Sequence, residues 1–208
     1  MKIITMIPAR ISSSRVIKKN IRLLGEIPLI SHIVRAAKNS KLAENIIINS
    51  EADIFYEIAK DEGIDFYKRP KKYSTDSATN DDFTLDFLEN NECDILIQLL
   101  PTSPFISSDE IDAFIKKMIS EKYETLISVN NVQIEAIFNN KPINFDQMKQ
   151  TPPSQHLVPV QAYACGIMGW STNRFKKNMI KYSAGYHGGD GKTGFFELLI
   201  KLKLFLFS

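Results

Sequence analysis

Over its first 130 residues the chain alternates short apolar runs with amphipathic segments, and this alternation limits the fold more than any other feature. The apolar runs are rich in β-branched and aromatic residues, which is typical of buried strands. They span residues 2–7, 45–49, 65–67, 94–100 and 125–129. The segments between them carry apolar side chains at helical spacing. Strands that alternate with helices predict an α/β fold, a mostly parallel sheet with helices on both faces.

Individual residues indicate where the helices begin and end. Pro28 is expected to open a helix that runs to about Ser40, and Gly63 to cap the helix over residues 51–62. Asp81 or Asp82 is expected to cap a third helix, and Ser107 or Ser108 a fourth.

Length and charge narrow the function classes. With 208 residues the chain can bury a sizeable core as a single domain, residues 1–208. The formal net charge is only +2, so the overall field does not favour a nucleic-acid partner. The only cysteines, Cys93 and Cys165, lie far apart and predict neither a disulfide framework nor a zinc site. The chain has no secretory signal pattern and no uncharged run of transmembrane length, so we expect a cytoplasmic protein without a membrane partner.

The positive charge that the chain does carry is concentrated directly after the first strand. Residues 7–20 contain two Arg, two Lys, three Ser and one Asn, with no acidic residue. Fixed cations beside hydroxyls and backbone amides suit a polyphosphate. A solvated basic loop is the simpler interpretation, but ligands of open α/β sheets bind beyond the carboxyl ends of the strands. The position of this loop therefore favours a phosphate-binding role.

Two further polar loops follow predicted strands. Arg69-Pro70 with residues 74–78 comes after the third strand, and residues 101–104, Pro-Thr-Ser-Pro, come after the fourth. Each has a simpler interpretation as a polar connection or a turn that starts a helix. Because the carboxyl ends of parallel strands meet at one edge, the three loops together predict a pocket there.

The alternation breaks after Asn130. Residues 130–160 are rich in Asn, Gln and Pro, and we interpret them as an inserted arm that serves as a lid or a dimer contact. Residues 162–170 then predict a strand, and a helix follows to about Tyr182. A Gly-rich loop over residues 185–194 leads to an apolar end with interspersed lysines. Apolar and polar residues alternate over residues 195–207, which fits an edge strand or a dimer contact.

These motifs together resemble the acylneuraminate cytidylyltransferases, the CMP-sialic acid synthetases. Pro8-Ala9-Arg10, Ser13, Arg15 and Lys19-Asn20 are similar to the signature of that family. Leu24-Gly25, Pro28-Leu29-Ile30, Arg69-Pro70 with residues 74–78, and residues 101–104 are similar to its later motifs. A weaker match covers residues 154–159, Tyr163 and Gly166. The resemblance extends from residue 1 to about Leu198 and implies a Rossmann-like sheet of the nucleotide-diphospho-sugar transferase type.

The resemblance also implies an activity, cofactors and partners. The family transfers CMP from CTP to a nonulosonic, sialic-acid-like sugar acid with release of pyrophosphate, uses Mg²⁺, works in lipopolysaccharide or capsule synthesis, and commonly forms a homodimer through its inserted segment. Arg10, Lys19 and Asn20 are implied as the catalytic residues. The implied nucleotide-binding residues are Ala9, Ser13, Arg15, Arg69, Asp76, Ala78 and Asn80. The implied substrate-binding residues are Gln98, Thr102, Ser103, Gln155 and Tyr163.

The chain departs from the family pattern at several positions. Ser12 stands in place of a glycine, Ile17 in place of a proline, and Leu100 in place of a glutamine. Gln98, two residues before Leu100, faces the same side of the strand and is a possible substitute for that glutamine, one step deeper in the sheet. Residues 49–51, Asn-Ser-Glu, stand where Ser-Thr-Asp is usual. The Asp-Ile-Asp motif that helps to hold Mg²⁺ has no match in the divergent tail, residues 199–208, and leaves the metal ligands unknown, with Asp190 and Glu197 as weak candidates. A catalytically impaired remnant that still binds CTP is therefore the alternative to an active enzyme.

Two remaining features predict no chemistry. Residues 191–193, Gly-Lys-Thr, end like a phosphate-binding P-loop, but Tyr186 stands where that motif needs its first glycine. His32, His156 and His187 share no metal-ligand spacing and are expected to be structural or solvated.

Overall fold

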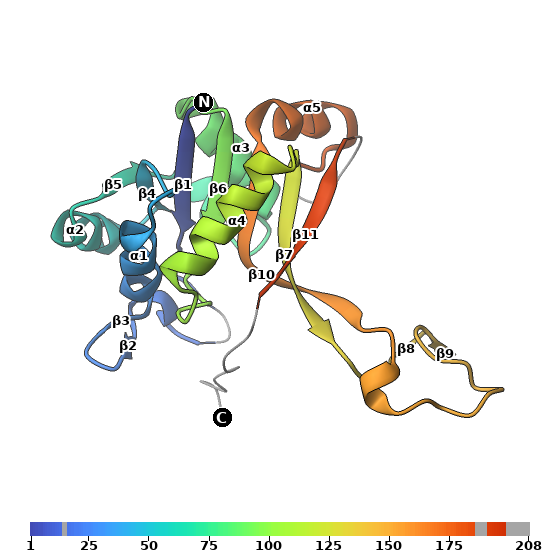
Figure 1. Cartoon of the computed structure of the whole chain (residues 1–208). Coiled ribbons are helices and arrows are strands. Elements are labelled where there is room, and N and C mark those ends of the chain that lie inside the picture. The colour runs from blue at the N-terminus through green and yellow to red at the C-terminus, as the bar shows by residue number, and fades with distance from the viewer. Residues whose placement is uncertain (14–15, 186–190, 199–208) are drawn as a thin grey trace.

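The computed structural model describes residues 1–13, 16–185 and 191–198. Its centre is a seven-stranded sheet in the order β11-β7-β10-β6-β1-β4-β5, with helices on both faces (Figure 1). The strands of this sheet are β1 (Ile3–Pro8), β4 (Ile46–Ser50), β5 (Asp65–Lys68), β6 (Ile95–Leu99), β7 (Thr125–Val132), β10 (Val160–Ser171) and β11 (Thr193–Glu197). The helices are α1 (Leu29–Asn39), α2 (Asp53–Glu62), α3 (Asn80–Asn90), α4 (Ser108–Ser120) and α5 (Thr172–Tyr182).

The sheet is mostly parallel, as the alternation predicts. β1 lies between β4 and β6 and runs parallel to both, and β5 continues the parallel set at the edge. β10 is antiparallel to β6 and β7, and β11 is parallel to β7. The carboxyl ends of β1, β4, β5 and β6 therefore meet at one edge, which we call the carboxyl rim.

Two hydrophobic clusters fill the space between the sheet and the helices. One cluster packs the apolar faces of α1, α2 and α4 on the sheet through residues such as Ile33, Phe55 and Phe114, none of which is exposed. The other packs α3 and α5 on the opposite face through Phe87 and Phe175. Both faces of the sheet are thus covered, which explains why β1 and β6 are buried along their whole length and are mostly apolar.

The predicted element boundaries mostly hold, and one helix cap differs. Gly63 ends α2 in the left-handed conformation (φ 66°), and Ser107 caps α4, both as expected. The N-cap of α3 is Thr79 rather than Asp81 or Asp82. Asp82 stands at the third helical position and accepts the Thr79 N–H (2.8 Å), while the Thr79 hydroxyl oxygen accepts the Asp82 N–H (3.2 Å). The aspartate therefore completes a capping box instead of capping the helix itself.

The chain between β7 and β10 leaves the body of the molecule as a protruding arm (Figure 1). It contains a two-stranded hairpin, β8 (Ile137–Phe138) and β9 (Lys141–Pro142), and a 3₁₀ turn, η3 (Ser154–His156). Asn139 and Asn140, both with positive φ, form the tight turn of the hairpin. Two apolar side chains of this hairpin, Ile137 and Phe138, are 60% and 67% exposed.

Four short elements lie in the loops that connect the main strands and helices. β2 (Leu23–Leu24) and β3 (Ile27–Pro28) form a hairpin that turns at Gly25, and η1 (Lys19–Ile21) and η2 (Lys71–Ser74) are 3₁₀ turns in the rim loops. β11 is an edge strand of the main sheet, whereas the tail predicted to be divergent, residues 199–208, lies outside the described residues. In the part of the chain that the structure describes, the helices are too short or too polar to cross a membrane.

Candidate nucleotide-binding site at the carboxyl rim

The loops after β1, β4 and β5 start from adjacent positions at the carboxyl rim. The Ala9 N–H donates to the Asn49 carbonyl (3.0 Å), and the Arg69 N–H donates to the Ser50 carbonyl (2.9 Å). The β-ladder thus extends one residue beyond each strand before the loops diverge. As a result, the basic loop and the loop that follows Arg69 begin on either side of Ser50 and Glu51.

Arg10 connects the basic loop to the loop after β5. Its Nη1 donates to the Asp76 carboxylate (2.9 Å) and to the Thr75 carbonyl (3.3 Å). The Arg10 side chain is 36% exposed and that of Asp76 is 80% exposed, so this ion pair lies in high dielectric. Such a pair contributes about 0–1 kcal/mol, and Arg10 can exchange it for a stronger anion at little cost.

A second and buried ion pair lies beneath the first. Glu51 and Arg69, whose side chains are 10% and 3% exposed, face each other at 3.2 Å. The Glu51 carboxylate also accepts the Ile11 N–H (2.9 Å) and the Ser74 hydroxyl (3.1 Å). Arg69 donates in addition to the Ala9 carbonyl, and its guanidinium lies 4.9 Å from the centre of the Phe83 ring. The resemblance assigns Arg69 to nucleotide binding, and the structure places it below the surface of the site.

Burial and pairing act in opposite directions on these two groups. Burial alone would raise the pKa of the Glu51 carboxyl, but the Ile11 N–H and the Arg69 guanidinium hold that pKa below its usual range. For Arg69, burial lowers the pKa, and the Glu51 carboxylate opposes this shift. Arginine stays charged even so, because its usual pKa is far above neutrality. The pair is therefore ionised at neutral pH.

The end of the basic loop returns to its start. Asn20, which is 9% exposed, donates through Nδ2 to the Arg10 carbonyl (3.2 Å). Lys18 has a positive φ (53°) just before η1, and Lys19 follows it as a half-buried residue. Ala9, Arg10, Lys19 and Asn20 thus share one loop at the rim, with Ser13 on the stretch between them. Arg15 lies outside the described residues.

Asn80 and Gln98 form a polar contact below the loop after β5. Gln98 on β6 has no exposed surface, and its Nε2 donates to Asn80 Oδ1 (2.8 Å), while Thr84 donates to Gln98 Oε1 (3.4 Å). Gln98 therefore lies deeper than the rim and anchors the first residue of α3. Ala78, two residues earlier, donates its N–H to the Thr75 carbonyl and is half-buried.

The residues assigned to the sugar substrate separate into two groups. Thr102 and Ser103 lie in the turn after β6, where the Leu100 N–H donates to the Gly166 carbonyl (3.0 Å). Tyr163, 47% exposed, precedes a bulge in β10 in which Cys165 has a positive φ (52°). Because β10 runs antiparallel to β6 and Ile167 pairs with Leu99, the Tyr163 end of β10 lies at the carboxyl rim. Gln155, by contrast, lies on η3 in the arm, away from the rim loops of its own chain (Figure 1).

Glu51 is the main rim residue to which the sequence assigns no role. Glu51 stands at the start of a predicted helix. In the comparison with the family pattern it appears only as the residue that stands in place of the usual aspartate. Its partners Ile11, Arg69 and Ser74 lie between 18 and 40 residues away. A contact among separate loops leaves no periodic pattern in the sequence.

The described residues do not build a metal site by themselves. They contain no group of three or more His, Cys, Asp or Glu side chains close enough to hold an ion. Glu51 is engaged with Arg69, and Asp76 is engaged with Arg10. Glu197 lies at the end of β11, and Asp190 lies outside the described residues.

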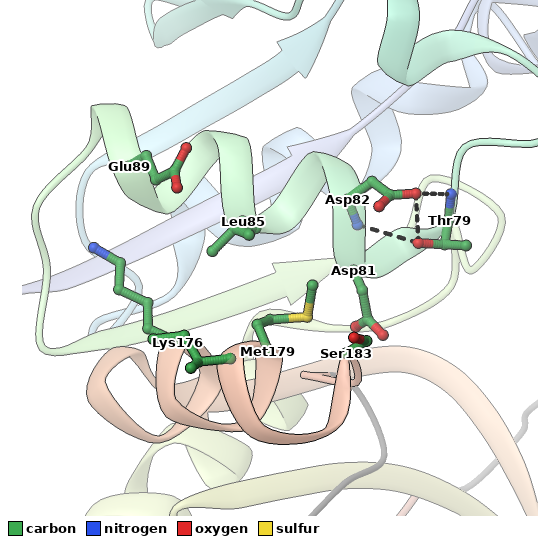
Figure 2. A pocket seen from close by; sticks show the side chains of 9 residues that line it. Thr79, Asp81, Asp82, Leu85, Glu89, Lys176, Met179 and Ser183 are labelled. Atoms are coloured by element: carbon green, nitrogen blue, oxygen red, sulfur yellow. Dashed lines mark hydrogen bonds between the residues drawn. The ribbon is translucent and has the colours of Figure 1, made fainter.

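A groove of about 590 Å³ lies between α3 and α5 (Figure 2). Asp81, Asp82 and Glu89 line one side of it, and Lys176, Met179 and Ser183 line the other. Leu85 and Ile180 also line it, and Thr79 contributes through the capping box of α3. The groove is predominantly a seam between two helices and contains none of the cations of the basic loop.

The sheet order and the rim loops define the class of the protein: an α/β nucleotidyltransferase fold. Among solved structures, CMP:2-keto-3-deoxy-manno-octonic acid synthetase complexed with CTP matches 95% of this chain and 90% of its own, with a TM-score of 0.71 at 13% identity. At that identity the similarity establishes the fold alone.

The family follows from the sequence comparison. Residues 4–162 match the family model described as cytidylyltransferase, and the chain belongs to this family. N-acylneuraminate cytidylyltransferase of Escherichia coli O18:K1:H7 is 34% identical over 145 residues, 68% of this chain and 32% of that protein. Post-translational flagellin modification protein B of Campylobacter coli is 26% identical over 202 residues, 94% of this chain and 85% of that protein. The chain spans about a third of the length of the N-acylneuraminate cytidylyltransferases from E. coli and Streptococcus agalactiae.

Proposed function

We propose that this chain transfers CMP from CTP to a nonulosonic sugar acid and releases pyrophosphate, as a cytoplasmic step in surface-glycan synthesis. Membership of the cytidylyltransferase family supports CTP as the nucleotide. The 34% identity to an N-acylneuraminate cytidylyltransferase supports a sialic-acid-like acceptor. The observation that carries the proposal is the meeting of the basic loop with the loop after β5 at the carboxyl rim.

In this proposal Arg10 and Lys19 neutralise the triphosphate and the departing pyrophosphate. The sugar hydroxyl attacks the α-phosphorus and loses its proton to solvent, the bond from that phosphorus to the bridging oxygen breaks, and pyrophosphate leaves with the electron pair. Such a transfer depends on positioning and charge stabilisation more than on covalent chemistry. Asn20 holds a phosphate or ribose oxygen near the α-phosphate, and Ser13 and Arg15 add donors. Ala9, buried next to Arg10, keeps this part of the loop close to the sheet.

The base is proposed to lie against the loop after β5. Ala78 is small enough to admit the ring, and Asn80 begins α3 beside it with its amide anchored by Gln98. Arg69 supports this wall from below through Glu51 and Ala9, and Asp76 holds the loop through Arg10. Thr102, Ser103 and Tyr163 are proposed to face the sugar acid, and Gln98 supports their side of the site from inside the sheet.

We also propose that two chains pair through their arms, which would give Gln155 a sugar site to reach in the second copy. The exposure of apolar side chains along the arm supports this pairing. Mg²⁺ is proposed to arrive with CTP, because Mg²⁺ is commonly bound by one or two carboxylates together with substrate phosphates.

The test is pyrophosphate release by the full chain with CTP, Mg²⁺ and a panel of nonulosonic acids. We expect turnover that depends on one sugar acid and stops with a chelator. CTP at 100 times its Kd should raise the Tm by about 5–10 °C, since saturation of that degree contributes about 2.7 kcal/mol. Stabilisation by CTP without turnover would overturn the catalytic part of the proposal, and no response to CTP would overturn all of it.

Arg10→Ala is expected to lower kcat/KM by about 10²–10³, the usual loss when one charge-stabilising donor is removed. Its Tm should change little, because the Arg10–Asp76 pair is exposed. Arg35→Ala is the matched control, since Arg35 pairs with Glu62 between α1 and α2, away from the rim. An equal loss of kcat/KM in both variants would contradict the role of Arg10.

A further inference from the structure

Arg10 can bind a triphosphate well only if its backbone stays in place when its side chain leaves Asp76. The Arg10 side chain is partly exposed, and its contacts with Thr75 and Asp76 involve an exposed loop. These contacts cannot fix the residue, because the ligand would replace them. The backbone around Arg10 must therefore be held by groups that stay in place when the ligand binds.

The peptide groups on both sides of Arg10 are held in this way. On the N-terminal side, the Ala9 carbonyl accepts a hydrogen bond from Arg69. On the C-terminal side, the Ile11 N–H donates to Glu51 Oε1 at 2.9 Å. The carbonyl of Arg10 itself accepts from Asn20 Nδ2 at 3.2 Å. Arg10 is thus held by three hydrogen bonds to consecutive residues of the loop.

Two of these three contacts depend on a single carboxylate. Glu51 holds Ile11 directly, and it holds Ala9 through Arg69, which it pairs with at 3.2 Å. Glu51 is anchored in turn by the Ser74 hydroxyl at 3.1 Å and by its place immediately after β4. Since Glu51 and Arg69 are both nearly buried, solvent screens their interaction only weakly.

We propose that Glu51 is the positioning residue for Arg10: its carboxylate fixes the basic loop so that the Arg10 side chain can exchange Asp76 for the triphosphate. The inference rests on the proposed function and deepens it. Glu51 touches no substrate in this scheme. Its side chain lies below the loop and acts through Ile11, Arg69 and Ala9.

A double-mutant cycle tests the coupling between the two residues. The full chain is compared with Glu51→Gln, Arg10→Ala and the double variant by equilibrium dialysis with radiolabelled CTP and Mg²⁺. We expect Glu51→Gln to weaken CTP binding at least tenfold in the wild-type background and less than threefold when Arg10 is absent. A merely structural role would give equal losses in both backgrounds, and that result would overturn the proposal.

Three further variants keep the test decisive. Asp53→Asn is the matched control, because Asp53 is an exposed carboxylate two residues away that pairs with Lys68, and it should bind CTP like the wild type. Glu51→Asp keeps the charge and should recover part of the lost affinity. If Glu51→Gln does not fold, Ser74→Ala removes one donor to the carboxylate and leaves the ion pair, with an expected two- to fivefold loss that disappears without Arg10.

The outcomes separate this inference from the proposed function. Wild-type protein that does not bind CTP would overturn the proposed function and this inference with it. Wild-type binding together with Glu51→Gln affinity within twofold of normal would overturn this inference alone. Loss of affinity in Asp53→Asn as large as in Glu51→Gln would also overturn it, because a general charge effect would then explain both.

Discussion

At the scale of single residues, the rim combines a weak ion pair with a strong one. The Arg10–Asp76 pair is exposed, so it contributes little to stability and yields easily to a ligand. The Glu51–Arg69 pair is nearly buried, and loss of one partner of such a pair costs about 3–5 kcal/mol. The chain therefore places its exchangeable contact at the surface and its permanent contact one layer below.

The depressed pKa of Glu51 predicts how stability depends on pH. The folded-state pKa is below the unfolded value, so the ionised carboxylate stabilises the fold above about pH 4.5, and this stabilisation is lost as the pH falls through the folded-state pKa. The charged groups that face Glu51 or its partner are Arg69, Arg10 and Asp86. Glu51→Gln should therefore destabilise the protein by about 3 kcal/mol at pH 7.

Thermal unfolding of both proteins from pH 7 to pH 3 checks this prediction. The difference in Tm should stay constant down to about pH 5 and shrink below it. A difference that is constant over the whole range would mean that the ionisation of Glu51 does not stabilise the fold.

Residue types in the sequence indicated the cations of the rim but not their support. Arg10, Lys19 and Asn20 stand in one short loop after a strand, so their meeting at the rim follows from the fold class. The contacts of Glu51 join loops that are up to 40 residues apart, and they depend on how β4 and β5 align. Local propensity and periodicity carry no information about such long-range polar contacts.

At the scale of elements, the strand and helix pattern was predictable up to β7, and the later part was less so. Each early strand is a short apolar run followed by an amphipathic helix, which defines both its type and its parallel direction. The direction of β10, antiparallel to both neighbours, depends on the arm that returns the chain to the sheet. Composition alone does not determine such a return.

The bulge in β10 brings Gly166 close to the turn that contains Thr102 and Ser103. A side chain at Gly166 would place its Cβ 2.7 Å from Ile106 Cδ1 and 3.0 Å from Ser103 Oγ. Gly166→Ala should therefore displace the Ile106 and Ser103 side chains beside the turn that holds Thr102. We expect a loss of about 1–3 kcal/mol in stability, the usual cost of overpacking, and a KM for the sugar acid raised severalfold with little change in the KM for CTP.

Gly63→Ala is the matched control for this change. Gly63 has a positive φ (66°) and no atoms near its would-be Cβ, so alanine there costs about 1 kcal/mol through the backbone alone. Its KM values should equal those of the wild type. The role of the bulge would be contradicted if Gly166→Ala lost stability but kept its KM for the sugar acid.

At the scale of the whole molecule, packing within the body does not account for the exposed apolar side chains of the arm. The sheet and its helices bury two apolar clusters and leave the arm projecting from one side (Figure 1). Ile134, Ile143 and Met148 are 56–92% exposed along it, in addition to Ile137 and Phe138. Several exposed apolar side chains on one projecting segment are typical of a surface that another chain covers.

Phe138→Glu tests whether that other chain is a second copy. Phe138 is 67% exposed at the hairpin of the arm, so the change should leave the fold intact while it places a charge on the proposed contact. Light scattering with size-exclusion chromatography should report a dimer for the wild type and a monomer for the variant, with a Tm for the body within a few degrees. Ile180→Glu is the control, because Ile180 is 89% exposed on α5, outside the arm, and should not change the mass. A wild-type mass of one chain, or a dimer that survives Phe138→Glu, would show that the arm does not pair two copies.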